Sequence, residues 1–290
     1  MTRSLIITAD DFGADLAVNE AVEIGHREGV LTAASLMVGA PAAPDAVARA
    51  RANPGLRVGL HLALVEARPS LHPKQIPHLV DASGRFRENM AAAGATMFFN
   101  PVARRELAAE IAAQFEAFAA TGLTLDHVNT HKHFHLHPTI AGLMLKIGAR
   151  YGLKAARIPI ERRDVLARVE PDGAYPASPV FDLWAAQARR RFRAAGIFIP
   201  DQVFGLTWSG AMTPARLDGL IEALPPGLSE VYLHPALRGG FPGAASGYRY
   251  ADELAALTAP QVAATVRRVG ARLGGFGDFA PAHQSESVLR

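Results

Sequence analysis

The sequence predicts an α/β fold, a single (β/α) barrel of the TIM type or a distorted form of it, with long loops at the carboxyl ends of its strands. Short apolar runs rich in β-branched residues alternate with longer Ala-, Arg- and Glu-rich segments of helical period, which is typical of a parallel sheet covered by helices. About eight such units fit into 290 residues, a usual length for one barrel. The turn after the first strand, ADDFGAD, lacks the G-x-G-x-x-G pattern of dinucleotide-binding folds. We therefore expect residues 1–290 to form one barrel domain.

Strands and helices follow one another closely at the start of the chain. We expect strands at residues 5–9, 31–38 and 57–62, and helices at residues 16–28 and 43–52, the second of which stops at an Asn-Pro-Gly sequence. The next segment, of about forty residues, contains prolines at 69, 73 and 77 and is expected to form a long loop with little regular structure. Long loops of compact domains usually carry function.

The alternation continues along the rest of the chain. A helix is expected at residues 102–121, where Leu107, Ile111, Phe115 and Phe118 share one face. A helix at residues 138–151 has a proline near its start. The other predicted strands are residues 125–130, 155–158, 202–206, 230–233 and 277–279, and the other predicted helices are residues 180–195, 214–224, 251–257 and 260–273.

The composition excludes several classes of function. The chain has no cysteine, so disulfides, thiol catalysis and thiolate metal sites are excluded together. Lys and Arg number 30 against 27 Asp and Glu, and because no basic stripe accompanies the formal charge of +3, we expect no nucleic-acid binding. The N-terminal segment lacks the apolar core of a signal peptide, and no stretch is long enough for a membrane span, so we predict a soluble, cytoplasmic protein.

Chemically active side chains lie at or directly after the carboxyl ends of five predicted strands, where barrel enzymes place their catalytic groups. They are Asp10, Asp11, His61, His131, Arg157 and His234. Each type has a plain structural interpretation: paired aspartates cap a helix, a histidine after an apolar strand is hydrogen-bonded in the core, and an arginine lies on the surface. Their common position favours one shared active site.

Five of the eleven histidines lie in the segment HVNTHKHFHLHP: His127, His131, His133, His135 and His137. Burial of several imidazoles is costly unless they are hydrogen-bonded or bind a metal, so the cluster indicates a metal site. Alternate residues of an extended segment share a face, so only one or two of these side chains reach the ion. Either His131 or His133 is the expected ligand, while the others orient ligands, contact substrate or cap the next helix.

Two imidazoles and one carboxylate form the ligand set of a catalytic divalent-metal site with positions open for water. Ligand softness favours Zn²⁺, Co²⁺ or Mn²⁺ for this set. A second carboxylate beside the liganding one would act as general base, Arg157 would keep that base ionised, and His234 would protonate a leaving group. These parts predict metal-assisted hydrolysis of an amide or ester.

Four spaced motifs resemble those of the YdjC-like carbohydrate deacetylases, distant relatives of the NodB-type polysaccharide deacetylases. They are TADDFG near the start, GLH at residues 59–61, HVNTHKHFH, and LHP at residues 233–235, so the resemblance covers nearly the whole chain. Segments such as ADDFGADLAVNEAVE and GVLTAASLMVGAPAA look most like the hopanoid-biosynthesis-associated branch (HpnK). That branch is implied to remove the N-acetyl group from an N-acetylglucosaminyl hopanoid and to release acetate.

The resemblance also implies roles for single residues. The family's metal ligands correspond here to Asp11, His61 and His131. Its catalytic groups correspond to Asp10 as general base, His234 as general acid and Arg157 as the support of the base. The resemblance adds Mg²⁺ to Zn²⁺ as the candidate ion. It further implies a homodimer, an N-acetylated amino-sugar substrate that is lipid-linked, and peripheral contact with the inner face of the membrane.

A lipid-linked substrate requires an apolar groove beside a polar sugar pocket. The predicted substrate contacts are His133, Phe204, Trp208 and Phe241, with residues 97–99 of the long loop as further candidates. The aromatic side chains among them would serve equally well to pin loops in place. The arginines at 189–191 and 193 form either a site for anionic headgroups or a solvated helix face.

Three alternative functions stay open. Soluble chitooligosaccharides are the main rival substrate within the deacetylases. A metal-dependent barrel of the amidohydrolase or phosphoesterase type is a second alternative, but such enzymes commonly place a His-x-His after the first strand, where this chain has Asp10 and Asp11. The third is a carbohydrate- or lipid-binding barrel without catalysis, although binding needs no base and acid beside a metal.

Overall fold

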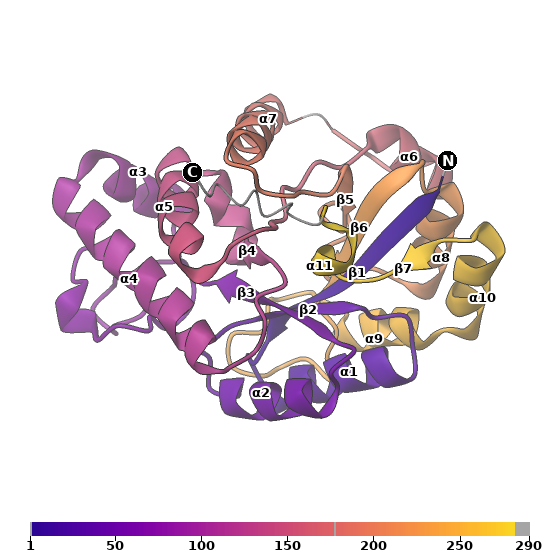
Figure 1. Ribbon diagram of the computed structural model, residues 1–290, viewed down its shortest axis with the longest axis horizontal. Helices are drawn as coiled ribbons and strands as arrows, with labels where there is room; N and C mark the ends of the chain where they lie inside the picture. The colour runs from indigo at the N-terminus through magenta and orange to yellow at the C-terminus, as the bar shows by residue number, and fades with distance from the viewer. Residues whose placement is uncertain (1, 177, 282–290) are drawn as a thin grey trace, which may run out of the picture.

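A curled sheet of parallel strands lies at the centre of the computed structural model, which describes residues 2–176 and 178–281 (Figure 1). Its strands are β1 (Arg3–Phe12), β2 (Ala33–Leu36), β3 (Arg57–Leu62), β4 (Val128–Thr130), β5 (Gln202–Phe204), β6 (Gly227–Leu233) and β7 (Arg272–Leu273). They pair in the order β4-β3-β2-β1-β6-β5, and β7 pairs with the beginning of β1. This architecture confirms the predicted α/β fold as a distorted barrel.

Residues 155–160 lie between the two edge strands, β4 and β5, and contact both, but they do not form a regular strand. Their contacts include two isolated parallel bridges, Val128 with Ala156 and Ala155 with Phe198. The Val203 N–H of β5 then donates to the Ile160 carbonyl at 3.0 Å. A regular strand was predicted at residues 155–158, and the structure has only isolated bridges there. Pro159, which follows, has no N–H with which to extend a ladder of hydrogen bonds.

Helices surround the sheet and connect its successive strands (Figure 1). The α-helices are α1 (Leu16–Arg27), α2 (Ala43–Ala52), α3 (Met90–Phe99), α4 (Pro101–Ala120), α5 (Pro138–Gly148), α6 (Arg163–Val169), α7 (Pro179–Ala194), α8 (Pro214–Ala223), α9 (Tyr250–Thr258), α10 (Pro260–Val269) and α11 (Phe276–Phe279). The short 3-10 helices are η1 (Pro73–Gln75), η2 (His131–Leu136) and η3 (Ala149–Tyr151). Within the described ranges, no helix combines the length and the apolar character needed to cross a membrane.

The long loop contains a helix that the sequence pattern did not predict. Helix α3 is rich in alanine, the strongest helix former, and the Asn89 side chain caps it by accepting the Ala92 N–H at 3.0 Å. Helix α6 was also not predicted. For α3, the prolines and glycine of the long loop had suggested irregular structure, whereas no element was predicted for the segment that contains α6.

The last described elements also differ from the prediction. Gly270, with a φ of 65°, ends α10 early, and the residues that follow pair with β1 as β7 where a helix was expected. The strand predicted at residues 277–279 is wrong, since these residues belong to α11. The Asp126 carboxylate accepts the N–H groups of Phe276 and Gly277 at 3.1 and 2.8 Å, which stabilises the first turn of a helix.

Helix α4 supports both the core and the long loop. Its predicted apolar face is buried, which confirms that face: Leu107, Ile111, Phe115 and Phe118. Toward the loop, the Glu110 carboxylate accepts the backbone N–H groups of Ser70 and Leu71 at 2.8 and 2.9 Å. Gln114 donates to the Ala63 carbonyl at 2.8 Å and accepts the Ala63 N–H at 3.0 Å. The loop is thereby held as a fixed wall beside the carboxyl ends of the strands.

Candidate metal centre and active site

Strand β1 ends in a bulge that brings two consecutive aspartates to the same end of the barrel. The register between β1 and β2 shifts between Ala9 and Phe12. Within this stretch Asp11 has a φ of 60°, a left-handed conformation that is uncommon outside glycine. Successive side chains of a regular strand point to opposite faces, so the bulge is what lets Asp10 and Asp11 serve one site. Backbone strain of this kind clusters at functional sites.

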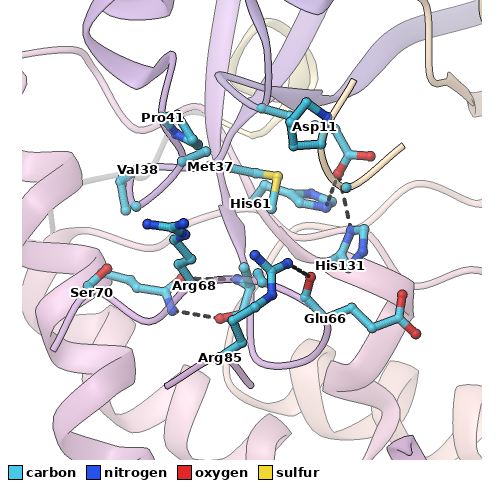
Figure 2. A pocket seen from close by; sticks show the side chains of 18 of the residues that line it. Asp11, Met37, Val38, Pro41, His61, Glu66, Arg68, Ser70, Arg85 and His131 are labelled. Atoms are coloured by element: carbon cyan, nitrogen blue, oxygen red, sulfur yellow. Dashed lines mark hydrogen bonds and ion pairs between the residues drawn. The ribbon is translucent and has the colours of Figure 1, made fainter. Parts of the chain in front are cut away.

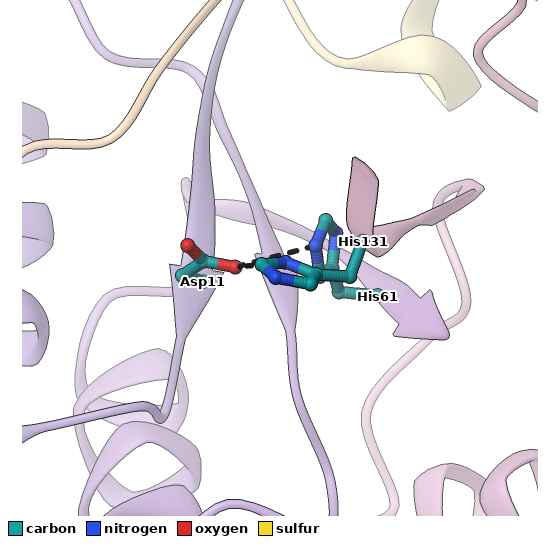
Figure 3. Close-up of side chains that lie close together, drawn as sticks. All are labelled: Asp11, His61 and His131. Carbon is teal, nitrogen blue, oxygen red and sulfur yellow. Dashed lines mark hydrogen bonds and ion pairs between the residues drawn. The ribbon is translucent and has the colours of Figure 1, made fainter. Parts of the chain in front are cut away.

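Asp11, His61 and His131 each bring one potential ligand atom to within 4.8 Å of the others. The Oδ1 oxygen of Asp11 lies 3.3 Å from His61 Nε2 and 3.1 Å from His131 Nδ1 (Figure 3). Strand β1, strand β3 and the turn after β4 supply the three side chains. We call them the triad. The structure thus groups His131 with Asp11 and His61, and it directs His133 elsewhere.

Charge within the triad favours an ionised carboxylate. Burial opposes the ionisation of Asp11, but the charge and the hydrogen bond of His131, with a smaller contribution from His61, outweigh it and hold the Asp11 pKa well below its ordinary value. Burial also disfavours the charged form of His131, yet the Asp11 carboxylate raises the His131 pKa overall. Asp11 is therefore available as an anionic metal ligand.

Arg157 is fully buried inside the barrel and joins two carboxylates. It donates to Asp10 through Nη1 and Nη2 at 2.5 and 3.0 Å. It also donates to Glu230 Oε1 through Nε and Nη2 at 2.9 and 2.7 Å. Burial opposes the ionisation of Asp10, but the guanidinium outweighs it and lowers the Asp10 pKa. Arg157 thus makes the predicted contact with Asp10, the aspartate that is not part of the triad.

His234 follows β6 and lies half-buried beside two tyrosines. The centre of its ring is 5.1 Å from that of Tyr248 and 5.8 Å from that of Tyr232. Its backbone N–H donates to the carboxylate of Glu253, which also accepts the Met212 N–H at 3.0 Å. The Nδ1 atom of His234 has no hydrogen-bond partner in the described part of the chain, so no other side chain there fixes the imidazole through this atom.

A cavity of about 250 Å³ opens onto the triad (Figure 2). Its walls come from residues 37–41 after β2, residues 63–70 of the long loop, and residues 241–243 in the glycine-rich segment after His234. Phe241, one of the predicted substrate contacts, belongs to this lining, as do the cationic side chains of Arg68 and Arg85. The cavity therefore offers a substrate direct access to the three potential ligands.

Three other predicted substrate contacts lie away from this cavity. His133 Nε2 is 2.8 Å from the Tyr232 hydroxyl, and burial together with the charge of Arg157 lowers the His133 pKa well below its ordinary value. Phe204 is fully buried within β5. Trp208 is also buried, and its indole N–H donates to a Glu170 oxygen at 3.0 Å. Their contact with substrate stays a prediction.

Sequence reasoning missed the polar side chains that support the site: Ser35, Asn129, Glu230 and Glu253. A signal for Asn129 existed in the motif HVNTH, because it alternates with His127 and His131 and so shares their face. Two further histidines of that segment are used within the fold. His127 Nε2 contacts the Ser35 hydroxyl at 3.2 Å, and His135 Nε2 donates to the Arg157 carbonyl at 2.8 Å.

A profile of the YdjC-like protein family matches residues 4–268. The chain belongs to this family. A carbohydrate deacetylase from Geobacillus stearothermophilus is 30% identical to this YdjC-like protein over 283 residues, which are 96% of this chain and 99% of that one. A carbohydrate deacetylase from Brevibacillus brevis is 36% identical over 178 residues, 58% of this chain and 66% of that protein.

One solved structure shares the fold of this YdjC-like protein over nearly its whole length. It is the crystal structure of a protein from Enterococcus faecalis described as a candidate cellobiose-phosphate cleavage protein. The TM-score is 0.75 at 24% sequence identity, and the match covers 97% of this chain and all of the other. At this identity the likeness concerns the fold alone.

Proposed function

We propose that this YdjC-like protein is a metal-dependent carbohydrate N-deacetylase, which hydrolyses the acetamide of an N-acetylglucosamine-type sugar to acetate and a free amine. The observation that carries the proposal is the meeting, at one end of the barrel, of three potential metal ligands, a carboxylate paired with a buried arginine and an imidazole. The two relatives that are named carbohydrate deacetylases support the substrate class. A non-catalytic binding barrel would not need this combination.

The donor set of the triad fits a divalent ion. Asn129 Oδ1 lies 2.7 Å from His61 Nδ1 and accepts its proton, so Nε2 carries the lone pair that a metal requires. That lone pair faces the Asp11 carboxylate at 3.3 Å and has no hydrogen-bond donor in the described residues, an arrangement that a bound cation stabilises. Imidazole ligands suit Zn²⁺, whereas Mg²⁺ prefers oxygen. When bound, such an ion polarises the acetamide carbonyl and lowers the pKa of water.

Two side chains of the chain would move the protons of the reaction. Asp10, charged and oriented by Arg157, would take a proton from the water as its oxygen bonds to the acetamide carbon. The C–N bond then breaks, and the protonated imidazole of His234 would give its proton to the departing nitrogen. Acetate and the amino sugar are the products, so the atoms of one water are divided between them.

Replacing His234 with alanine is expected to lower kcat for acetate release by about 10²–10⁴, the usual contribution of one acid–base group. Metal content and the melting temperature should stay close to those of the wild-type protein, because no side-chain hydrogen bond within the described residues is lost. Acetate can be measured with a coupled enzymatic assay. His72→Ala, at an exposed histidine in the long loop, is the matched control. An unchanged kcat in His234→Ala would remove His234 from the mechanism.

A second cavity, of about 660 Å³, suggests where an apolar part of the substrate binds. Its lining is mostly apolar and comes from α3, η2 and the start of α7, with Phe98, Phe99, Val180 and Trp184 among the large side chains. Phe99 is 78% and Val180 67% exposed, which is unusual for side chains of this size. Lys132 and His133 line this cavity directly after the triad residue His131, so we call it the apolar groove and place it next to the active site.

We propose that the substrate is an N-acetylated amino sugar on a lipid, and that the apolar groove holds the lipid. The motifs that resemble the hopanoid branch of the family point to a hopanoid as this lipid, and peripheral contact with the membrane that contains it would follow. The groove favours this substrate over a soluble chitooligosaccharide, which has no apolar part of comparable size. Sugar and lipid would then be bound on the two sides of residues 131–133.

Trp184→Ala tests the apolar groove. Loss of the indole surface should raise KM for an N-acetylglucosaminide with a large apolar aglycone. The increase should be about tenfold larger than the increase of KM for chitobiose, because burial of one large apolar side chain contributes a few kcal/mol at most and only the apolar aglycone would contact it. Initial rates of acetate release on both substrates give the ratio. Leu16→Ala, another exposed apolar residue but outside the groove, should leave the ratio unchanged. Equal changes for both substrates would contradict a lipid site and favour the chitooligosaccharide alternative.

A further inference from the structure

Asn129 occupies the centre of β4 and uses every polar atom of its side chain. It is fully buried. Its Nδ2 group donates to Ser35 Oγ at 2.8 Å and to Asp10 Oδ1 at 3.1 Å. Its Oδ1 atom lies 2.7 Å from His61 Nδ1. One amide therefore contacts both a potential metal ligand, His61, and the proposed general base, Asp10.

The partners of Asn129 determine the orientation of its amide. Both oxygens of Asp10 accept hydrogen bonds from the Arg157 guanidinium, and Ser35 gives its own proton to Asp10 Oδ1 at 2.9 Å, so this carboxylate acts as an acceptor. The side facing these two groups must be the NH₂ group, which leaves the Asn129 oxygen for His61. An oxygen at that place requires a proton on His61 Nδ1, and the lone pair must then be on Nε2.

We propose that Asn129 is a positioning residue that holds His61 in its metal-binding tautomer and at the same time orients the carboxylate of Asp10. The half of this proposal that concerns Asp10 rests on the proposed function. The half that concerns His61 does not, because it predicts metal affinity. Asn129 itself touches neither the ion nor the substrate, and it acts through the two side chains to which it is hydrogen-bonded.

Two substitutions separate the two contacts. Asn129→Asp keeps an oxygen that accepts the His61 proton, but it has no NH₂ group to donate and adds a negative charge beside Asp10. Asn129→Leu has a similar volume and loses both contacts. Gln202→Leu is the matched control, because Gln202 is also a buried amide of the sheet but donates to Ser229 at 2.8 Å, outside the site.

Zinc affinity, measured by competition with a chromophoric chelator, should fall about 10–100-fold in Asn129→Leu, the usual effect of losing the partner of a liganding histidine. It should stay within about threefold of the wild-type value in Asn129→Asp and in Gln202→Leu, because His61 keeps its acceptor in both. Acetate release should nevertheless fall at least tenfold in Asn129→Asp with zinc bound. A residue with a merely structural role would weaken zinc binding alike in both Asn129 variants, and that result would overturn the proposal.

Nitrogen NMR of the metal-free wild-type protein supplies a test that does not depend on folding of the variants. We expect the His61 ring to carry its proton on Nδ1, and a proton on Nε2 instead would overturn the proposal. If the wild-type protein releases acetate from no acetylated sugar, the proposed function fails, whereas the zinc affinities and the tautomer still decide the role of Asn129 toward His61.

Discussion

Asp11→Asn is expected to abolish divalent-metal binding and acetate release together, whereas Asp10→Asn should keep the metal and lose turnover by about 10²–10⁴. The two substitutions are identical in chemistry and adjacent in sequence. Asn is among the residues that tolerate the left-handed φ of 60° at position 11, so the backbone need not change. At position 11 a neutral amide replaces the anionic oxygen that lies close to both triad histidines. At position 10 the proposed proton acceptor and the charge that pairs with Arg157 are lost, but the three triad side chains are unchanged.

Metal content after dialysis and the kcat for acetate release measure the two effects independently. His26→Ala, a histidine whose ring contacts the Leu31 carbonyl outside the site, provides a control for unspecific loss of metal. Full activity of Asp10→Asn would rule out Asp10 as the general base. Tight metal binding by Asp11→Asn would show that the ion, if it is required, is held elsewhere.

Arg157→Met is expected to destabilise the protein by about 3–5 kcal/mol, because removal of one partner leaves uncompensated charge in the barrel interior. Arg157 has no exposed surface and donates to both Asp10 and Glu230. Methionine has a similar length but no charge and no donor. The free energy of unfolding can be measured with urea, by circular dichroism, at neutral pH.

Arg163→Met is the matched control for this experiment. Arg163 pairs with Asp182 on the surface, where solvent screens the interaction, and its replacement should change stability far less. Equal and small effects of both substitutions would mean that the buried carboxylates are satisfied without the guanidinium. In that case the assignment of Arg157 as the support of Asp10 would have to be abandoned.

Part of the site was predictable because it depends on local pattern. Short apolar runs bury strands, parallel strands present their carboxyl ends at one edge, and the residues directly after those runs therefore meet. This reasoning brought together the residues that the structure places at one end of the barrel: Asp10, Asp11, His61, His131, Arg157 and His234. Phe204 and Trp208 are buried, because an aromatic side chain near a strand end packs into the core as readily as it lines a cavity, and their contact with substrate stays a prediction.

The elements that were missed have a common cause. Helix α3 lies in a segment whose prolines precede it, and the local pattern did not show that Asn89 would cap an alanine-rich stretch. Strand β7 is only two residues long and exists because β1 offers an unpaired edge at Ser4 and Leu5. Short elements such as these are decided by their partners, since their own residues supply too few hydrogen bonds.

The sequence by itself determined the alternation of strands and helices, the absence of thiol ligands, and the residue types that gather at the carboxyl ends of the strands. Only the tertiary structure decided which of the two histidines, His131 or His133, lies beside Asp11. These residues would share a face in a strand, but the chain turns through left-handed conformations at Lys132 and His133, with φ of 53° and 54°, so His131 meets Asp11 and His133 meets Tyr232. The hydrogen bonds that fix Asn129 likewise join residues 119 and 94 positions apart in the sequence. Periodicity reports which face of one element is buried, whereas contacts between distant elements form only when the barrel closes.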